Sequence, residues 1–392
     1  MHPISVVITG SARTPMGDFL GCLNQVKTYE LGATAIKGAL KRSSIDPLQV
    51  DEVLMGCVLS AGLGQAPARQ AALGAGLPTT VGCTTINKMC GSGMKAVMLA
   101  HDLIKAGSAK IVVAGGMESM SNAPYLLPNM RSGQRIGHDK VIDHMYMDGL
   151  EDAQDQRLMG CYAEDCAEKY SFSRAQQDEF AIQSLTRAQT AMENGRFKDE
   201  IEAVILSPKK TALSIHHDEH PQLHDVNKFS SLKPVFKTDG TVTAANSSCI
   251  SDGAAALVLM SESEAKKRRI TPLAKIIAHQ SHAQEPAWFT TAPIFAIEKL
   301  LKKNAMQSND INLFEINEAF AVVVLAAIKE LQLDRNKVNI HGGACALGHP
   351  IGASGARIIV TLLSALQQYG LKRGLASLCI GGGEATAMLI ER

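Results

Sequence analysis

Short apolar runs alternate with alanine-rich stretches along most of the chain. Residues 110–114 form one such run after a helix-like stretch at 92–105, and residues 376–380 form another after a stretch at 355–368. Short runs of consecutive apolar, often β-branched residues are typical of strands buried on both faces, and the longer stretches are typical of helices that cover them. A further strand is expected at residues 4–8 (ISVVI). The pattern predicts α/β layers around a largely buried sheet.

The same order of elements occurs twice. Residues 90–119 run from a small-residue helix start (CGSGMKA) through a helix to a buried strand that ends in glycines (IVVAGGMES). Residues 352–385 repeat this order with GASGAR and SLCIGGGEA. Segments 51–56 and 313–318 occupy comparable places upstream. We therefore predict two similar α/β halves, with reactive residues where strands meet helices.

The chain between the repeats has a different composition. Residues 119–237 are richer in charge, Met, His and Asn, with helices expected at 159–170 and 174–194. The predicted division has an N-terminal half at 1–118, to which 242–270 returns, an inserted loop domain at 119–241, and a C-terminal half at 271–392. Residues 216–220 (HHDEH) are expected to form a solvated loop. Metal binding there is disfavoured because His216 and His217 are adjacent and do not share a helical face.

Composition excludes several classes of protein. With 46% hydrophobic and 20% charged residues the chain is typical of globular proteins, and its net charge of +1 gives no field that would recruit nucleic acid or a membrane surface. Its nine cysteines form no CxxC pair, which argues against a disulfide framework or structural zinc and favours a reducing compartment. No apolar run reaches the roughly 18 residues that span a bilayer. Met1 leads directly toward the first strand without a signal-like segment, so a cytoplasmic protein is expected.

Three glycine-rich segments each hold one reactive side chain. Cys90 lies in residues 87–93 (NKMCGSG), His349 in 348–355 (GHPIGASG) and Cys379 in 379–383 (CIGGG). Glycine removes the Cβ that would block a substrate, and it leaves backbone N–H groups free to stabilise an oxyanion. A thiol, an imidazole and a second thiol are the components of a nucleophile and its base. A single cysteine is more often a small buried hydrophobe, but three such segments favour catalysis.

These segments resemble those of the thiolases, of the acetyl-CoA acetyltransferase type. The resemblance extends over nearly the whole length and includes residues 13–17 (RTPMG), 115–121 (GGMESMS), 148–150 (DGL), 240–248 (GTVTAANSS) and 317–321 (NEAFA). It implies a duplicated five-layer α/β/α/β/α sandwich of two five-stranded halves, with an inserted loop domain that binds coenzyme A. It also implies a homotetramer, a dimer of dimers, assembled through the loop near 120–135.

The resemblance implies a reaction and a role for each residue. Two acetyl-CoA would condense reversibly to acetoacetyl-CoA and free CoA through an acetyl-Cys90 intermediate. His349 would deprotonate Cys90, and Cys379 would remove the α-proton of the second acetyl-CoA. Asn317 would hold a water in one oxyanion hole with His349, although it also fits the N-cap of the helix that follows. The N–H groups of Cys90 and Gly381 would form the other hole. The CoA thioesters are substrates, and neither a cofactor nor a metal is expected.

Further residues match the pantetheine tunnel of the family, which needs apolar walls with a few hydrogen-bonding groups. They are Leu150, Met159, Phe236, Ala244, Ser248 and Phe320. Other positions depart from the family pattern near the CoA arm or the acyl pocket. They are Leu158, Gln222, His341, Glu384 and the aromatic pair Trp288 and Phe289. These departures bear on the substrate more than on the reaction.

Three alternatives remain beside this reading. The first is a degradative thiolase that cleaves longer 3-ketoacyl-CoA, although residues 121–127 with Arg131 and Arg135 resemble the short-chain branch. The second is a decarboxylating ketoacyl synthase, whose family normally combines one Cys with two His. The third is a non-catalytic acyl-CoA-binding protein, which would have lost at least one of the reactive residues.

Overall fold

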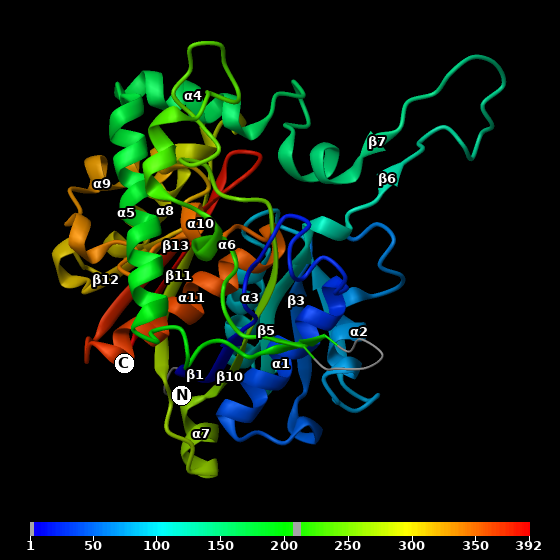
Figure 1. The fold of residues 1–392 in the computed structure, drawn as a ribbon. Helices are drawn as coiled ribbons and strands as arrows, with labels where there is room; N and C mark the ends of the chain where they lie inside the picture. The colour runs from blue at the N-terminus through cyan, green and yellow to red at the C-terminus, as the bar shows by residue number, and fades with distance from the viewer. Residues whose placement is uncertain (1–3, 207–212) are drawn as a thin grey trace.

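The computed structural model describes residues 4–206 and 213–392, and one mixed sheet runs through it (Figure 1). Its strands follow the order β12-β13-β14-β11-β1-β10-β5-β3-β4. The first half contributes β1 (Val6–Arg13), β3 (Glu52–Gly56), β4 (Gly82–Ile86), β5 (Ile111–Ser119) and β10 (Ser251–Ser261), with β2 (Gly17–Asp18) paired to β10. The second half contributes β11 (Ala274–Ala283), β12 (Leu313–Ile316), β13 (Arg373–Ile380) and β14 (Glu384–Glu391).

The two halves join where β1 pairs with β11 through Val7 and Ile8. Among its described residues the second half contributes four strands rather than the five that were expected, and beyond them Phe314 of β12 forms a single parallel bridge with Val338. The strand expected at 4–8 begins at Val6, and Met1 lies outside the described residues.

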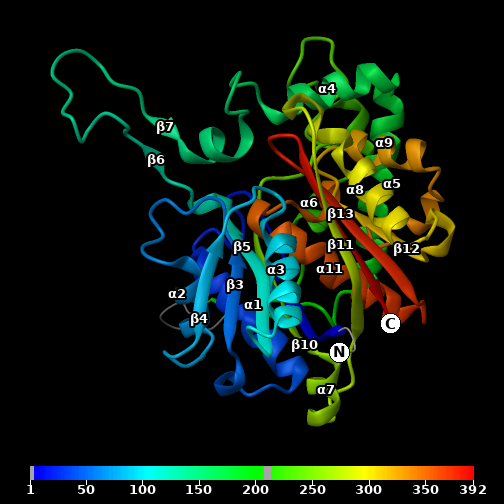
Figure 2. The ribbon, with the colours of Figure 1, turned by 180° about the vertical axis from the view of Figure 1, so that it is seen from behind.

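Helices form three layers around the sheet (Figures 1 and 2). In the middle layer α3 (Ser92–Ala106) packs against α11 (Ile351–Gln368), and α11 contacts strands of both halves. The outer face of the first half is covered by α1 (Thr28–Ser43) and α2 (Pro67–Gly74). On the second half α8 (Ala292–Lys303) lies on the sheet with α9 (Ala321–Leu331) beside it. The predicted layered α/β architecture is confirmed.

Backbone touches backbone where the halves meet in the middle layer. A Cβ on Gly56 would lie 2.7 Å from the carbonyl oxygen of Gly352, and one on Gly93 would lie 3.1 Å from the same atom. A Cβ on Gly116 would overlap that oxygen. These four positions form a glycine junction between the first half and the start of α11, and only glycine fits it without displacing the backbone.

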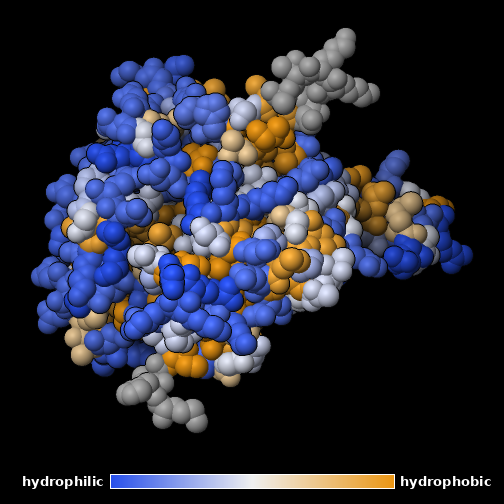
Figure 3. Space-filling view, turned by 90° about the horizontal axis from the view of Figure 1, so that it is seen from below, coloured by the Kyte–Doolittle hydropathy of each residue, from blue (hydrophilic) through white to orange (hydrophobic). Residues whose placement is uncertain are grey.

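The chain between β5 and β10 packs mainly on the second half. Its helices α4 (Met159–Tyr170) and α5 (Arg174–Glu193) lie where they were predicted and contact α9. Strands β6 (Tyr125–Leu126) and β7 (Ile142–Asp143) form the base of an arm that projects from the body (Figure 1). Figure 3 shows hydrophobic surface on this arm, at the right of the view. Its exposed large hydrophobic residues are Tyr125, Leu127, Met130, Ile136 and Val141.

The remaining elements are short. They are the strands β8 (Val204–Leu206) and β9 (Leu213–Ile215), the helices α6 (His220–Leu223), α7 (Glu262–Arg268) and α10 (Ala344–Leu347), the π-helix η3 (Tyr146–Leu150), and the 3₁₀-helices η1 (Pro47–Gln49), η2 (Met120–Asn122), η4 (Val226–Ser231), η5 (Pro286–Thr291), η6 (Ser308–Asp310) and η7 (Arg335–Lys337).

Candidate active site

Cys90 lies in a sharp turn between β4 and α3. Met89 before it adopts a left-handed conformation with φ of +47°, which is strained for a residue with a side chain. Ser92 braces the turn, because its Oγ accepts from the Lys88 N–H at 2.8 Å and donates to the Met89 carbonyl at 2.6 Å. The turn therefore presents the Cys90 thiol at the N-terminus of α3.

His349 lies just before α11 with its tautomer fixed. Its Nδ1 lies 2.5 Å from the Oγ of Ser354, and that hydroxyl donates its own proton to the Pro350 carbonyl at 2.9 Å. The hydroxyl must therefore accept from Nδ1–H, which leaves Nε2 with a free lone pair. Burial, with the charge of Arg357 added, lowers the pKa of His349 to about 3. The imidazole is thus neutral at pH 7, which is the form that acts as a base.

Asn317 lies against this imidazole. Its Nδ2 is 3.4 Å from Nε2 of His349, and its Oδ1 accepts from Nη2 of the buried Arg357 at 3.4 Å. The Asn317 N–H donates to the Ser377 carbonyl at 3.0 Å, which holds the loop after β12 beside β13. Helix α9 begins only at Ala321, so the expectation of Asn317 as its N-cap is wrong. The residue lies in the loop before the helix, with its amide directed at the imidazole.

The second thiol and the last glycine segment complete the cluster. Cys379, at the end of β13, is fully buried, and burial raises its pKa well above the ordinary value, with Cys90 nearby raising it further. Burial also raises the pKa of Cys90 to about 11, although the N–H of Gly381 and its own N–H act in the opposite direction. These two N–H groups therefore lie beside the Cys90 sulfur, next to the place where the oxygen of an acyl group attached to it would develop charge.

The sequence reading missed a buried carboxylate below the site. Glu118, at the end of β5, accepts from the N–H groups of Val58 at 3.0 Å, Leu59 at 3.1 Å and Gly352 at 2.9 Å. Burial raises its pKa to about 7 against the effect of these donors. Because Gly352 lies in the first turn of α11, Glu118 ties the helix that follows His349 to two strand ends of the first half. An acidic residue near the end of a buried, glycine-rich strand was the signal available for it.

A cavity of about 590 Å³ lies beside the cluster. All six predicted tunnel residues line it, namely Leu150, Met159, Phe236, Ala244, Ser248 and Phe320. Met159 links the cavity to the cluster, because its sulfur would lie 3.6 Å from a Cβ on Gly381. Leu150 and Cys90 pack against the same apolar residues. An apolar cavity with a few polar groups suits a long, mostly neutral ligand arm.

The departures from the family pattern fall into two groups. Leu158 lines the cavity, and Glu384 forms a 2.5 Å ion pair with Lys88 in the Cys90 turn. Gln222 donates to the Asp218 carbonyl at 2.9 Å, within its own turn. Leu158 and Glu384, which face the cavity and the Cys90 turn, are therefore the departures able to change which substrate is bound.

The aromatic pair and His341 act from further away. Nζ of Lys169 lies over the Trp288 ring, 4.1 Å from the ring centroid. Phe289 meets Phe320 of the cavity wall edge-on, with centroids 6.5 Å apart. His341 is buried, and burial lowers its pKa to about 4. Of these residues Phe289 is the one that shapes the cavity, through Phe320.

Comparison with known proteins agrees with this geometry. Residues 6–263 match the sequence model of the family "Thiolase, N-terminal domain", and residues 270–392 match "Thiolase, C-terminal domain". The chain belongs to the thiolase family. The boundary between the two thiolase regions falls just before β11, where the second half begins.

Relatives and a solved structure match over nearly the full length. Acetyl-CoA acetyltransferase 2 of Arabidopsis thaliana is 51% identical over 100% of this chain and 98% of its own. "Acetyl-CoA acetyltransferase ERG10, cytosolic" of Gibberella zeae is 46% identical over 98% of each. The crystal structure of the Bacillus anthracis acetyl-CoA acetyltransferase superposes with a TM-score of 0.97 at 43% identity, covering 99% of this chain and 98% of that one. Within residues 4–206 and 213–392, this thiolase has no helix long and apolar enough to cross a membrane.

Proposed function

We propose that this thiolase is an acetyl-CoA C-acetyltransferase that condenses two acetyl-CoA to acetoacetyl-CoA and CoA, reversibly. The observation that carries the proposal is the arrangement of three distant segments beside an apolar cavity. Cys90 lies near Cys379, and Asn317 joins the imidazole of His349 to the strand that carries Cys379. The backbone N–H of His349 donates to the carbonyl of Cys249 in the cavity wall. The names of relatives near 50% identity support the same activity. All the reactive residues are present, which argues against a non-catalytic acyl-CoA-binding protein.

In the first half-reaction Nε2 of His349 takes the proton of Cys90, and the thiolate attacks the carbonyl of acetyl-CoA. The tetrahedral oxyanion is stabilised by the N–H groups of Cys90 and Gly381, which already face the sulfur. CoA then leaves with the proton from His349, and acetyl-Cys90 remains. Exchange of one thioester for another is nearly isoenergetic, so the step runs in both directions.

In the second half-reaction the Cys379 thiol gives its proton to Nε2 of His349, and the resulting thiolate removes an α-proton from a second acetyl-CoA. The raised pKa of its thiol makes the conjugate thiolate a strong base, which suits a weakly acidic carbon. The enolate oxygen accepts from the protonated Nε2 of His349 and from a water on the Asn317 amide, and the enolate carbon attacks the carbonyl of acetyl-Cys90. Acetoacetyl-CoA leaves, and the Cys90 thiolate takes the proton from Nε2 of His349, which restores the resting thiol and neutral imidazole. Side chains, backbone donors and a water carry every step, so we propose no cofactor or metal for the reaction.

The proposal extends to assembly and location. The apolar side chains of the projecting arm are suited to burial against other subunits, in a dimer of dimers. The near-neutral net charge gives no reason to expect nucleic acid or a membrane surface as a partner. A cytoplasmic location agrees with the Gibberella zeae relative, which is named as cytosolic.

The testing experiment measures CoA-dependent thiolysis across 3-ketoacyl-CoA substrates of increasing chain length. Turnover confined to acetoacetyl-CoA is expected, and turnover that persists with long chains would assign the degradative activity instead. The Cys379→Ala variant tests whether Cys90 is the acyl acceptor and Cys379 is the base of the second half-reaction. It should still become acetylated at Cys90, seen as a mass shift with acetyl-CoA, while overall turnover is lost. Cys90→Ser should lose both, and full turnover by Cys90→Ser would refute the mechanism.

A further inference from the structure

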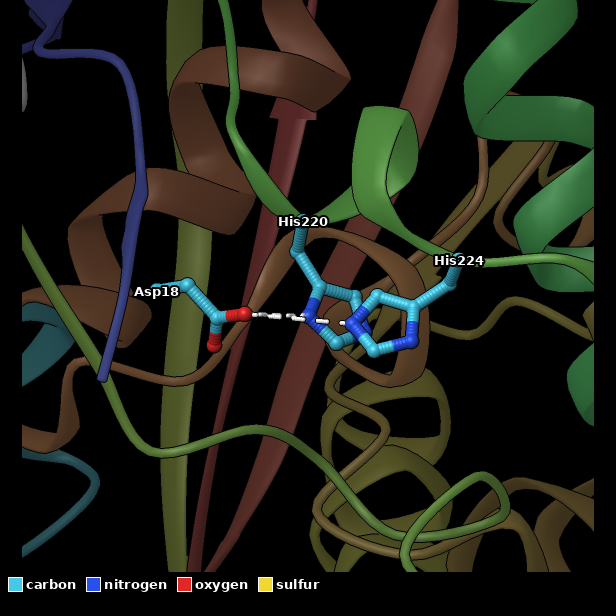
Figure 4. Close-up of side chains that lie close together, drawn as sticks. All are labelled: Asp18, His220 and His224. Atoms are coloured by element: carbon cyan, nitrogen blue, oxygen red, sulfur yellow. Dashed lines mark hydrogen bonds and ion pairs between the residues drawn. The ribbon is translucent and has the colours of Figure 1, made fainter. Parts of the chain in front are cut away.

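Three side chains that the proposed reaction does not use converge on the wall of the cavity. Asp18 comes from β2, and His220 and His224 come from α6 and its C-terminal end (Figure 4). Their ligand atoms all lie within 4.8 Å of one another. Oδ2 of Asp18 is 3.3 Å from Nδ1 of His220 and 3.8 Å from Nε2 of His224. All three residues line the same cavity as the tunnel residues.

The surrounding chain fixes both sides of this cluster. Asp18 pairs with Ser251 of β10, and its N–H donates to the Glu219 carboxylate at 2.9 Å. Glu219 directly precedes His220, so one carboxylate joins the two segments that carry the ligands. From α5, the Gln189 amide donates to the carbonyls of Pro221 at 2.9 Å and His224 at 3.3 Å. The two backbone segments that carry the three side chains are therefore anchored.

We propose that Asp18, His220 and His224 bind a divalent transition-metal ion, with Zn²⁺ as the reference ion. Two imidazoles and one carboxylate are a ligand set that zinc accepts, with one position left open. Tetrahedral bonds of about 2.0–2.1 Å place ligand atoms roughly 3.3–3.4 Å apart. The 3.3 Å separation of Asp18 from His220 already matches. The His224 ring packs against that of His220, with centroids 3.8 Å apart and planes 31° apart, so it must rotate to direct Nε2 at the ion and to shorten its 3.8 Å separation from Asp18.

A fourth residue supports the metal over other ligands. Sγ of Cys249 lies 2.9 Å from Nε2 of His220, the ring nitrogen that faces away from Asp18. A metal on Nδ1 leaves Nε2–H to donate to this sulfur, which takes the place of the oxygen acceptor that metal-binding histidines normally have. A phosphate on the same imidazoles would face the Asp18 carboxylate, so the charge of the cluster favours a cation.

The histidine-rich segment was set aside on sequence grounds because His216 and His217 are adjacent. The pair that the fold uses is His220 and His224, four residues apart, completed by Asp18 from about 200 positions earlier in the chain. The open position of the ion faces the cavity. If the proposed function holds, zinc bound there hinders entry of the CoA arm and inhibits thiolysis.

Binding is tested without any turnover. Zn²⁺ is titrated into the Cys90→Ser protein, which lacks the reactive thiol, in competition with a chromophoric chelator. One ion per chain is expected, lost in the further variants His224→Ala and Asp18→Asn and retained in the matched control His216→Ala/His217→Ala. Thermal unfolding of each variant checks that it is folded. Absence of stoichiometric binding, or its loss only in the control, would overturn the site.

Two further measurements test which residues bind the metal and whether metal binding inhibits the enzyme. Co²⁺ in the same protein should give tetrahedral absorption without a sulfur-to-cobalt charge-transfer band, and such a band would overturn the assignment of Cys249 to the outer shell. In the enzyme with Cys90 intact, added Zn²⁺ should lower thiolysis relative to the metal-free rate of the same variant. In the His224→Ala variant, the ratio of the thiolysis rate with Zn²⁺ to the rate without it should return to one. Stoichiometric binding without inhibition would refute the regulatory consequence, and failure of the proposed activity would leave the binding result standing.

Discussion

The protonation state of Cys90 at rest is the sharpest test of the proposed chemistry. Burial raises the pKa of Cys90 to about 11, and burial lowers the pKa of His349 to about 3. Together these shifts make a neutral thiol and a neutral imidazole the resting pair, rather than a thiolate and an imidazolium. Substrate carbonyl must therefore be in place before the proton moves.

The expected magnitude follows from the shift of Cys90 from its reference value of 9.0 to about 11. At pH 7 the thiolate fraction falls about 100-fold, from roughly 10⁻² to 10⁻⁴. A more basic thiolate is also more nucleophilic, which recovers about tenfold at a Brønsted coefficient of about 0.4–0.5. The fall in thiolate fraction outweighs the gain in nucleophilicity, so Cys90 should be alkylated about tenfold more slowly than an unperturbed thiol.

The assay is the rate of carboxamidomethylation of Cys90 by iodoacetamide, followed by mass spectrometry of its peptide from neutral to alkaline pH. The rate should rise about tenfold per pH unit and begin to level only near pH 11, in step with the thiolate fraction. The Cys90→Ser variant controls for reaction at the other cysteines, and circular dichroism at each pH checks folding. A rate that is already level at neutral pH would reveal a thiolate–imidazolium pair and refute the reasoning.

Three further predictions follow from the packing around the site. Gly348→Ala should lower the free energy of unfolding by about 1–3 kcal/mol from backbone strain alone, because its φ is +97°, and by more because the new Cβ overlaps Oγ of Ser251. Adding Ser251→Gly should restore only the overlap part in denaturant unfolding, and full recovery would contradict the strain. Ser354→Ala removes the acceptor that fixes the imidazole tautomer, so kcat should fall about tenfold or more in steady-state thiolysis. Ser364→Ala on the same helix is the control and should not change kcat. Replacing residues 128–140 of the arm with a short turn should convert a tetramer to a dimer in light scattering, and an unchanged mass would refute the assembly.

Local pattern was enough to predict the layers and the helices that bury one face. The boundaries of α4 agree with the expected 159–170, between Leu158 in an extended conformation and Ser171 in a left-handed one. The start of α11 was placed too late, at 355, since Gly352 and its small neighbours resemble a loop. The helix begins at Ile351, where Pro350 precedes it and the distant Glu118 accepts the Gly352 N–H. That support comes from another strand and leaves no trace in the local sequence.

The reactive residues were predictable because glycine flanks each of them, whereas the residues that hold them were not. Ser354 and Arg357 read as ordinary positions of a small-residue helix, yet one fixes the imidazole tautomer and the other contacts Asn317. The Asp18 cluster was hidden for a similar reason. Two of its members lie in one short turn, and the third lies where β2 meets β10. Only the fold brings such sequence-distant side chains into contact.

The glycine junction limits how this enzyme can change. Cys90 follows a strand of the first half and His349 precedes α11, so the separation of thiol and imidazole depends on how closely those backbones approach. At Gly116 and Gly352 that approach is set by main-chain atoms, which every amino acid shares. Substitutions in the cavity wall are therefore free to alter substrate range while the reacting geometry stays fixed. A laboratory search for new acyl specificities should gain from mutating the wall and lose from mutating the junction, where even one methyl group would push the two halves apart.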